Sequence, residues 1–212
     1  MRIAPTFMRF GSFEIFKPHD PMTGGAGPSI GLKDKMLPPM LNYLLKYHCP
    51  EISSEFDGDE TLPQQYKILF ENIVRSTARL ASLWQCYGFC HGVLNTDNLS
   101  VMGVTIDYGP FAWMEHHDPD FICNHSDQDR GRYRYKAQPD ICKWNLEKLA
   151  EALDPILDIE FSTNLIREQY DIMYLDFWTT RMAQKLGFLI TEPVEPASIG
   201  TSRPTFKDSE FR

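Results

Sequence analysis

Apolar residues recur at intervals of three and four along residues 64–89, a spacing that places side chains on one face of a helix. Gly88 closes this run, and glycine commonly ends a helix. The same spacing predicts a short helix over residues 37–47, another over 143–153 and a long one over 163–186. The pattern therefore predicts a mainly helical protein.

Residues 99–107 have roughly alternating apolar positions around Met102-Gly103, which predicts a short β-hairpin. Together with the helices, this hairpin predicts an α+β fold that is mostly α-helical. Four phenylalanines near the amino terminus are spaced by three, which predicts one helical face in contact with the core. These are Phe7, Phe10, Phe13 and Phe16.

The remaining segments lack a regular apolar period and are predicted to be connections. Residues 17–35 are rich in Gly and Pro, and residues 51–63 are acidic and polar. Residues 109–141 are rich in Asp, His, Pro and Gly, and so long a loop in a compact domain is usually functional. Residues 191–212 are predicted to be a disordered tail after a single domain over residues 1–190.

Composition limits the class of protein. The chain has 212 residues, 42% hydrophobic and 24% charged, which suffices for the core of one domain. Its 21 Lys and Arg residues against 29 Asp and Glu give a net charge of −8, which argues against a nucleic-acid partner. No apolar run reaches about 18 residues, so no membrane partner is expected. The five scattered cysteines fit a reduced compartment, and no amino-terminal targeting pattern is visible.

The glycines between residues 24 and 31 invite comparison with phosphate-binding loops. A P-loop needs Gly followed by Lys and then Ser or Thr, whereas Gly31 is followed by Leu32. The dinucleotide-binding pattern fails as well, and no strand precedes the cluster. A flexible connection is the simpler interpretation.

A group of potential metal ligands lies between residues 116 and 129. It consists of His116, His117, Asp118, Asp120, Cys123, His125, Asp127 and Asp129. Zinc sites typically pair cysteines two to four residues apart with matching histidines. Only Cys86 and Cys90 approach that spacing, and they lie at one helix end. A metal-binding module is therefore the weakest of the alternatives.

Residues 90–109 carry the most informative chemical pattern. Protein kinases use a His-Arg-Asp motif, a later Asn and then Asp-Phe-Gly, and the Asn and the second Asp hold Mg²⁺ beside the nucleotide. His91 and Asn98 have the kinase spacing, and Asp-Tyr-Gly at residues 107–109 stands where Asp-Phe-Gly belongs. Carboxylate and amide oxygens are the hard donors that Mg²⁺ prefers.

The catalytic aspartate of the kinase pattern is replaced by Val93, which cannot accept a proton. A conventional phosphotransferase is therefore disfavoured. Asp97, directly before Asn98, could place a carboxylate near the same metal. Taken singly, Asp97 and Asn98 could cap a turn and Asp107 could end a strand. Their joint order and spacing favour a nucleotide site.

Longer motifs in the chain resemble the selenoprotein O family, and among its members the animal proteins more than the bacterial ones. The resemblance covers about residues 2–187. The matching stretches are residues 2–14 (RIAPTFMRFGSFE), 91–98 (HGVLNTDN), 105–111 (TIDYGPF), 118–119 (DP), 123–127 (CNHSD), 131–133 (GRY), 138–139 (QP), 144–146 (WNL) and 148–150 (KLA).

This resemblance implies a protein-kinase-like fold that binds ATP in a flipped orientation and transfers AMP to Ser, Thr or Tyr hydroxyls of protein substrates. Asp97 would accept the hydroxyl proton. Asn98 and Asp107 would ligate Mg²⁺, and Asp107 would also lie against the nucleotide. Arg2 and Arg9, seven residues apart as in the family, would contact the ATP phosphates. The valine in place of the kinase aspartate is normal in this family.

The chain departs from the family in its extent. It is expected to lack the glycine-rich loop and the phosphate-binding lysine of the N-lobe, which Lys33 and Lys35 are not placed to replace, and the long carboxy-terminal region. Residues 1–190 would then be mainly a kinase-like C-lobe whose hairpin carries the metal site, with weak or absent AMP transfer. A non-catalytic pseudokinase fragment that binds a partner is the alternative. Animal members are mitochondrial, and the resemblance implies that location.

Overall fold

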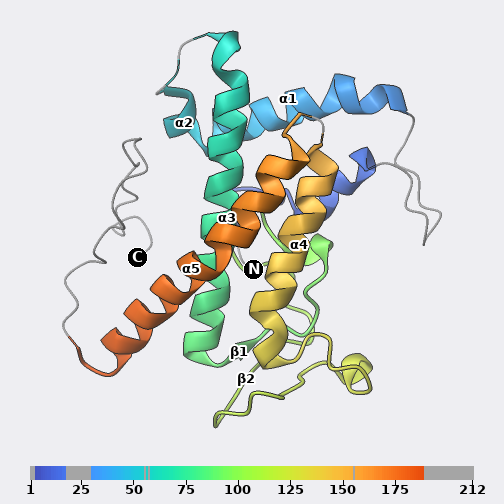
Figure 1. The fold of residues 1–212 in the computed structure, drawn as a ribbon. Helices are drawn as coiled ribbons and strands as arrows, with labels where there is room; N and C mark the ends of the chain where they lie inside the picture. Colours follow the sequence, from blue (N-terminus) through green and yellow to red (C-terminus); the bar gives the residue numbers. More distant parts are fainter. Residues whose placement is uncertain (1–2, 18–29, 55, 57, 155, 189–212) are drawn as a thin grey trace.

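Helix α3 (Leu62–Tyr87) is the central element of the fold, and α4 (Gln138–Leu153) and α5 (Ile159–Lys185) pack beside it (Figure 1). Each of these helices buries an apolar face in one shared core. Gly88 ends α3 in the left-handed conformation, with φ of 72°, and its N–H bonds to the Trp84 carbonyl. Three of the four helices predicted from the apolar spacing are thus confirmed, and the fourth, predicted over residues 37–47, lies within α1 (Ile30–His48).

The computed structural model describes residues 3–17, 30–54, 56, 58–154 and 156–188. Arg2, the glycines at positions 24, 25 and 27, and the tail predicted over residues 191–212 lie outside the described residues. The domain boundary at residue 190 therefore remains a prediction.

Helices α1 (Ile30–His48) and α2 (Pro50–Ser54) lie at the end of the molecule where α3 begins (Figure 1). Strands β1 (Phe89–Cys90) and β2 (Ala112–Trp113) pair antiparallel at the other end of α3. The short 3₁₀ helices are η1 (Phe10–Phe16), η2 (Asp59–Thr61), η3 (Thr96–Asn98), η4 (His125–Asp127) and η5 (Tyr135–Ala137). The mainly helical α+β class is therefore confirmed.

Helix α1 begins earlier than predicted. The sequence predicts a connection over residues 17–35, but α1 starts at Ile30 and continues through Pro38 and Pro39. Proline removes a backbone donor and normally interrupts a helix. Burial of the leucine face of α1 in the core accompanies this continuous helix, and packing commonly overrides local propensity. The leucines concerned are Leu37, Leu41, Leu44 and Leu45.

The predicted connection over residues 51–63 also contains helical structure, because α2, η2 and the first turn of α3 fall within it. Likewise α4 begins at Gln138, inside the long loop predicted over residues 109–141. Both α3 and α4 have a proline in the first turn, at positions 63 and 139. Proline is favoured there because the first helical N–H groups have no partner within the helix.

The phenylalanine spacing is explained by η1, because a 3₁₀ helix has three residues per turn and residues three apart lie on one side. Phe10, Phe13 and Phe16 are buried in the core. Phe7 precedes the helix and is 63% exposed, so its predicted core contact is wrong.

The hairpin predicted over residues 99–107 is reduced to one antiparallel bridge between Leu99 and Thr105. A tight turn joins the two residues, and Gly103 adopts a positive φ of 61° in it. A β-carbon at Gly103 would lie 2.6 Å from Cβ of Ser76 on α3, so the turn packs closely against that helix. The chain reversal was predicted correctly, whereas the extended strands lie elsewhere.

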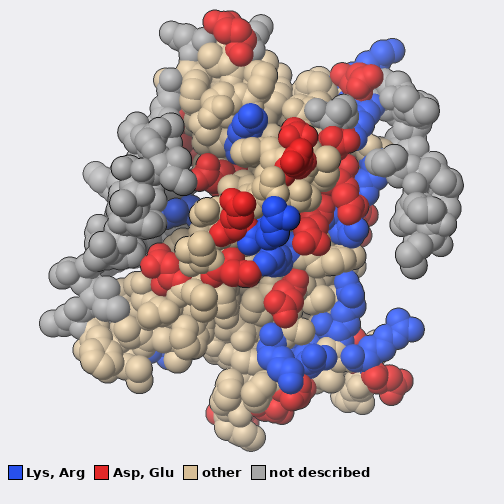
Figure 2. Space-filling model, in the orientation of Figure 1, with Lys and Arg blue, Asp and Glu red and all other residues tan. Residues whose placement is uncertain are grey.

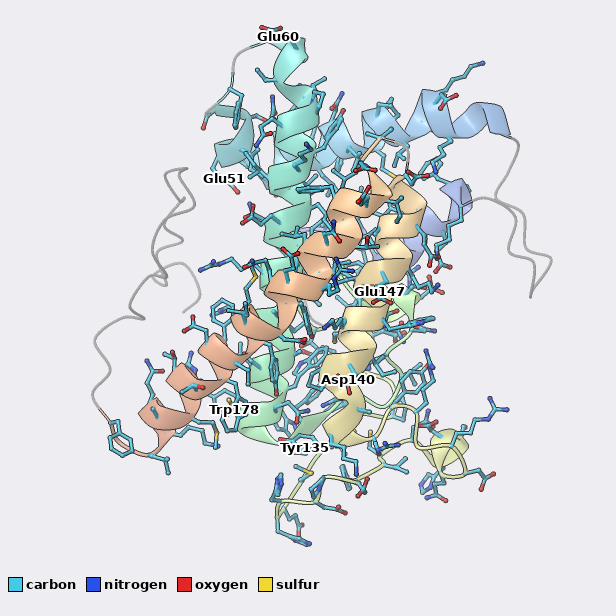
Figure 3. All side chains as sticks on the ribbon, viewed as in Figure 1. Glu51, Glu60, Tyr135, Asp140, Glu147 and Trp178 are labelled. Atoms are coloured by element: carbon cyan, nitrogen blue, oxygen red, sulfur yellow. The ribbon has the colours of Figure 1, made fainter. Side chains whose placement is uncertain are left out.

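Tyr135 and Trp178 tie the end of α3 to the rest of the molecule (Figure 3). The Tyr135 hydroxyl donates to the Gln85 carbonyl, and the Gln85 side chain donates back to the Tyr135 carbonyl at 2.7 Å. The Cys86 thiol donates to the Trp178 carbonyl at 3.7 Å. These bonds fix the end of α3 from which the candidate site begins.

Within the described residues, no helix combines the length and the apolar character needed to cross a lipid bilayer. On the face shown in Figure 2, Lys and Arg side chains are interspersed with Asp and Glu. The expectation that nucleic acid is not a partner remains a prediction.

Candidate active site

The loop from His91 to Asn98 follows β1 directly and is held by side chains of α4. The His91 N–H donates to Oε1 of Gln138 at 2.9 Å, and Nε2 of Gln138 donates to the Phe89 carbonyl at 2.8 Å. Further along α4, Nδ2 of Asn145 donates to the Leu94 carbonyl at 2.9 Å. Both of these α4 side chains are buried, so the loop is bonded on its inner side rather than solvated.

His91 connects this loop to the segment that carries Asp107. Its Nε2 lies 2.8 Å from the Ile106 carbonyl oxygen, so Nε2 carries the proton, and Nδ1 accepts the Val93 N–H at 3.4 Å. Burial lowers the pKa of His91, although the Ile106 carbonyl and Asp107 oppose that shift. A neutral imidazole satisfies both contacts, because protonation would place an Nδ1–H against the Val93 N–H. His91 therefore acts as a structural link between the two segments.

Asn98 is oriented by the residue that replaces the kinase aspartate. Its Nδ2 donates to the Val93 carbonyl at 2.9 Å, and its backbone N–H closes η3 onto the Asn95 carbonyl at 3.0 Å. Asn98 is buried, and its amide nitrogen is already engaged in this contact. The amide oxygen, a hard donor, remains for a cation. Val93 thus contacts Asn98 through its backbone carbonyl.

Asp97 is exposed in the middle of η3 and lies against Gly11 of the amino-terminal segment. A β-carbon at Gly11 would lie 2.2 Å from Oδ1 of Asp97 and 3.2 Å from its Cα. Only glycine leaves room for this carboxylate in its observed position.

Asp107 has a φ of 53°, the one positive value among the described non-glycine residues. The Gly109 N–H donates to the Asp107 carbonyl at 2.8 Å, which closes a tight turn, and the Asp107 side chain is exposed. The left-handed conformation is unfavourable for most residues with a β-carbon. Strain of this kind gathers at functional sites, so the backbone of Asp107 favours a role beyond folding.

The bridge between Leu99 and Thr105 brings the Asn98 and Asp107 segments together. Asn98 directly precedes Leu99, and Ile106 directly follows Thr105, so the antiparallel pairing places these two neighbours side by side. Trp84 of α3 supports the bridge, since its Nε1 donates to the Thr105 hydroxyl at 3.0 Å. The contact of His91 with Ile106 is a second tie between the same segments.

Arg9 precedes η1 and forms an antiparallel bridge with Ser100, just beyond the Asp97–Asn98 turn. Its guanidinium lies 5.6 Å from the centre of the Phe7 ring. Nε of Arg9 is buried without a hydrogen-bond partner, which is costly for a cation. An anion at this position would satisfy it. Burial lowers the pKa of Lys33 on α1, although the charge of Asp154 after α4 opposes that shift.

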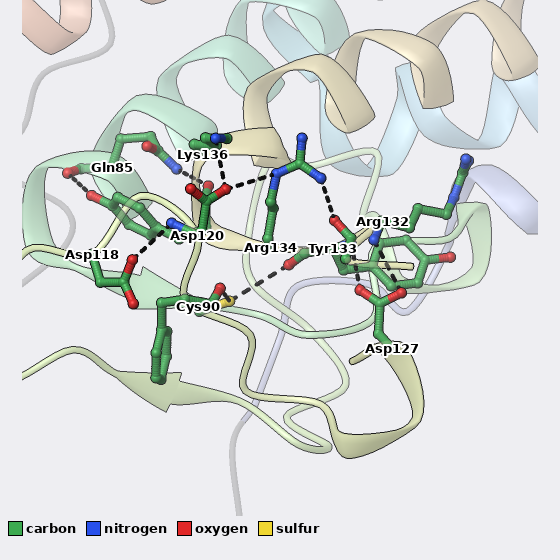
Figure 4. Close-up of polar contacts among 12 residues, drawn as sticks. Gln85, Cys90, Asp118, Asp120, Asp127, Arg132, Tyr133, Arg134 and Lys136 are labelled. Carbon is green, nitrogen blue, oxygen red and sulfur yellow. Dashed lines mark hydrogen bonds and ion pairs between the residues drawn. The ribbon is translucent and has the colours of Figure 1, made fainter. Parts of the chain in front are cut away.

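The long segment after β2 packs against the same loop (Figure 4). The Cys90 thiol donates to the Tyr133 carbonyl at 3.6 Å, and the Cys123 thiol donates to the Cys90 carbonyl at 3.4 Å. Nδ2 of Asn124 donates to the Gly92 carbonyl at 3.1 Å. The segment predicted as a functional loop therefore lies beside the candidate site.

Asp127 organises the far part of this segment (Figure 4). Its buried carboxylate accepts the backbone N–H of Arg132 at 3.1 Å and of Tyr133 at 2.7 Å. Asp120, in contrast, is exposed and pairs with Arg134 and Lys136. Among the described residues, no three His, Cys, Asp or Glu side chains are gathered for a metal ion. Asp127 and Asp120 are therefore observed in structural contacts.

Several contacts of the site carry no signal in the sequence pattern. The Thr96 hydroxyl donates to Oε1 of Glu14 at 2.8 Å, across 82 residues of chain. Gln138 and Asn145 match the family motifs, but spacing alone does not pair them with the backbone of Phe89 and Leu94. Such partners become visible only when the chain is folded.

The comparisons with known proteins identify the family of this chain. The family model described as protein adenylyltransferase SelO matches residues 1–203. The chain belongs to the selenoprotein O family. It is 47% identical to the mouse mitochondrial protein adenylyltransferase SelO over 199 residues, which is 94% of this chain and 30% of that relative. The human counterpart is 46% identical over the same length, covering 29% of its own chain.

Bacterial members of the selenoprotein O family are similar as well. The protein nucleotidyltransferase YdiU of Aeromonas salmonicida is 41% identical over 198 residues, covering 93% of this chain and 36% of the relative. The chain thus spans about a third of the length of the relatives it matches.

Proposed function

We propose that this chain carries the metal- and phosphate-binding half of a protein adenylyltransferase built like the C-lobe of a protein kinase, with residues 1–190 as its domain. The supporting observation is the Asn98 contact with the Val93 carbonyl, next to the His91 link to the Asp107 segment. These two contacts join the segments that carry the candidate metal ligands Asn98 and Asp107. Asp97 is the exposed carboxylate next to Asn98. The full activity belongs to proteins about three times longer, so AMP transfer by this chain is part of the proposal.

The residues suit Mg²⁺ and the phosphates of ATP. Asn98 would hold the cation through its free amide oxygen, and Asp107 through its exposed carboxylate. Bound Mg²⁺ would neutralise phosphate charge and orient the phosphates. The unpaired Nε of Arg9 fits an anionic phosphate oxygen, and Arg2 is proposed for the same role.

In the proposed reaction, a Ser, Thr or Tyr hydroxyl oxygen of a protein substrate attacks the α-phosphorus of ATP. A new P–O bond forms, the bond between the α-phosphorus and the bridging oxygen breaks, and pyrophosphate leaves. Asp97 accepts the hydroxyl proton, since its carboxylate is exposed and lies close to Gly11. Val93 offers only its carbonyl, so it cannot perform this step.

The test is incubation of the purified chain with Mg²⁺ and ATP labelled at the α-phosphate, with a parallel sample labelled at the γ-phosphate. We expect weak α-label on protein from the wild type, in keeping with the weak transfer predicted from the sequence, and none from Asp107→Ala. Asp129→Ala, which removes another exposed carboxylate, is the matched control and should keep the label. Label only from the γ-position would indicate phosphate transfer, and no label from either would contradict the proposal.

We further propose a mitochondrial location. The mouse, human and zebrafish relatives carry this location in their names. Immunofluorescence of the native protein in its own cells tests it, and a signal that does not coincide with a mitochondrial marker would contradict it.

A further inference from the structure

Glu14 reaches from the amino-terminal segment to the turn that carries Asp97. The Thr96 hydroxyl donates to Oε1 of Glu14 at 2.8 Å, and Thr96 is buried. Thr96 is the first residue of η3 and the immediate neighbour of Asp97. A carboxylate accepting from a buried hydroxyl is a charge-assisted bond, which is stronger than a neutral one.

The backbone brings Glu14 to this place. The Phe10 N–H donates to the Leu99 carbonyl at 3.0 Å, and the Val101 N–H donates to the Met8 carbonyl at 3.3 Å. These bonds attach the amino-terminal segment beyond the Asp97 turn. The contact of Glu14 with Thr96 attaches the beginning of the turn. Asp97 therefore lies between two attachment points on one segment.

Gly11 contributes a steric limit at the same place. A β-carbon there would lie 2.2 Å from Oδ1 of Asp97, so the carboxylate lies directly on the segment backbone. Asp97 is thus limited on one side by Gly11 and tied through its neighbour Thr96 to Glu14.

Glu14 is itself held in place. Nζ of Lys17 lies 3.4 Å from Oε1 of Glu14 and 3.6 Å from Oε2 of Glu151 on α4. These ion pairs are partly exposed, and pairs of that kind add little stability. Their effect is to orient the Glu14 carboxylate toward Thr96.

We propose that Glu14 is a positioning residue for Asp97: by accepting the Thr96 hydroxyl, it fixes the turn so that the Asp97 carboxylate meets the substrate hydroxyl. This proposal rests on the proposed function, in which Asp97 accepts the proton. A displacement of about 1 Å at a reacting group can reduce the rate about 100-fold. Glu14→Ala is expected to lower kcat by about 10- to 100-fold with little change in the KM for ATP.

Four single variants separate the hydrogen bond from charge and bulk. Glu14→Gln keeps an acceptor oxygen and Thr96→Ser keeps the hydroxyl. Both variants should therefore retain kcat within about threefold, because the contact is only weakened. Glu14→Ala and Thr96→Val remove the bond from either side and should lose kcat alike. The double variant of these two should be no worse than either one, because both remove the same contact. Glu147→Ala removes an exposed carboxylate elsewhere on α4 and serves as the control.

Amide hydrogen exchange over residues 93–101, measured without ATP in the same proteins, needs no activity. Glu14→Ala and Thr96→Val should raise exchange at residues 96–98 several-fold, whereas Glu14→Gln and Thr96→Ser should match the wild type. Unchanged exchange in Glu14→Ala and Thr96→Val would show that the Glu14–Thr96 contact does not restrain the turn. Faster exchange with unchanged kcat in an active protein would overturn the positioning role.

The two proposals can be told apart when they fail. An inactive wild-type chain would overturn the proposed function and with it the catalytic role of Glu14, although exchange would still decide whether Glu14 fixes the turn. An active wild type in which Glu14→Ala keeps full kcat would overturn only the positioning role.

Discussion

Nε2 of His91 donates to the carbonyl oxygen of Ile106 at 2.8 Å and thereby joins the loop that ends at Asn98 to the segment that presents Asp107. The imidazole is buried, and its second nitrogen accepts the Val93 N–H. The contact with Val93 depends on a neutral histidine, because a protonated Nδ1 cannot accept a hydrogen bond, and this makes the loop sensitive to pH.

The free energy of unfolding should depend on His91 below about pH 6.5, the usual pKa of histidine in an unfolded chain. Burial lowers the pKa of His91 in the folded protein, so the unfolded chain binds the proton more readily. The stabilisation is complete above the unfolded pKa and is lost as the pH falls toward the folded pKa. The wild type should have a larger free energy of unfolding than His91→Gln, and urea unfolding at pH 7.5 and 5.5 should show that this difference is smaller at pH 5.5. An equal difference in the free energy of unfolding at the two pH values would show that burial does not oppose protonation of the His91 ring.

Gly11→Ala should destabilise the protein by about 1–3 kcal/mol, because the new methyl group would overlap the Asp97 carboxylate and approach its backbone. Gly109→Ala is the matched control, since nothing lies within 4 Å of a β-carbon there, and its change should stay within about 0.5 kcal/mol. Urea unfolding followed by tryptophan fluorescence measures both. Equal values for the two variants would mean that the turn moves aside freely.

Asp107→Gly should separate stability from activity. At a φ of 53° glycine carries no steric penalty, so this variant should be about 1 kcal/mol more stable than Asp107→Ala. Both should lose AMP transfer, because both lose the proposed metal ligand. The measurements are urea unfolding and α-phosphate label on protein. AMP transfer retained by Asp107→Gly would contradict the role of the carboxylate.

Cys123 should react with iodoacetamide at pH 7.5 before the other four cysteines. Interaction with the side chain of Cys90 lowers the pKa of Cys123, and Cys123 is half-buried. The other four are buried, and burial raises the pKa of Cys49 to about 12. Since the thiolate is the reactive form, Cys123 should be labelled at least about 10-fold faster.

Peptide mass spectrometry over a time course reads out this order. Cys90→Ala removes the neighbouring thiol that lowers the pKa of Cys123 and should slow the labelling of Cys123. Faster labelling of Cys86 than of Cys123 would contradict the expected order, because burial raises the pKa of the Cys86 thiol.

Local rules predicted much of the fold. The apolar period gave α3, α4 and α5 because each helix buries a single face, and Gly88 ends α3 as glycine does elsewhere. The start of α1 could not be predicted, because Pro38 and Pro39 oppose a helix locally and only packing of the leucine face supports it. The helix type of η1 was also undecided, although three-residue spacing matches a 3₁₀ turn.

The candidate site was likewise predictable from the sequence only in part. The order and spacing of His91, Asn98 and Asp107 identify the motif, and the longer motifs identify the family, because these residues lie close together along the chain. Spacing cannot tell which atom each side chain contacts. That Asn98 bonds to the Val93 carbonyl, or that Asp107 has a positive φ, required the backbone path.

By itself the sequence determined the helical class, the residues with chemistry to offer and the family to which the chain belongs. Only the tertiary structure decided that Glu14 bonds to Thr96 and that Gly11 borders Asp97, since more than 80 residues separate each pair. Local patterns follow from steric and hydrophobic periods that act over a few residues. Contacts over such separations exist only because the shared core brings η1 against α4 and the loop after β1, and no local period records that arrangement.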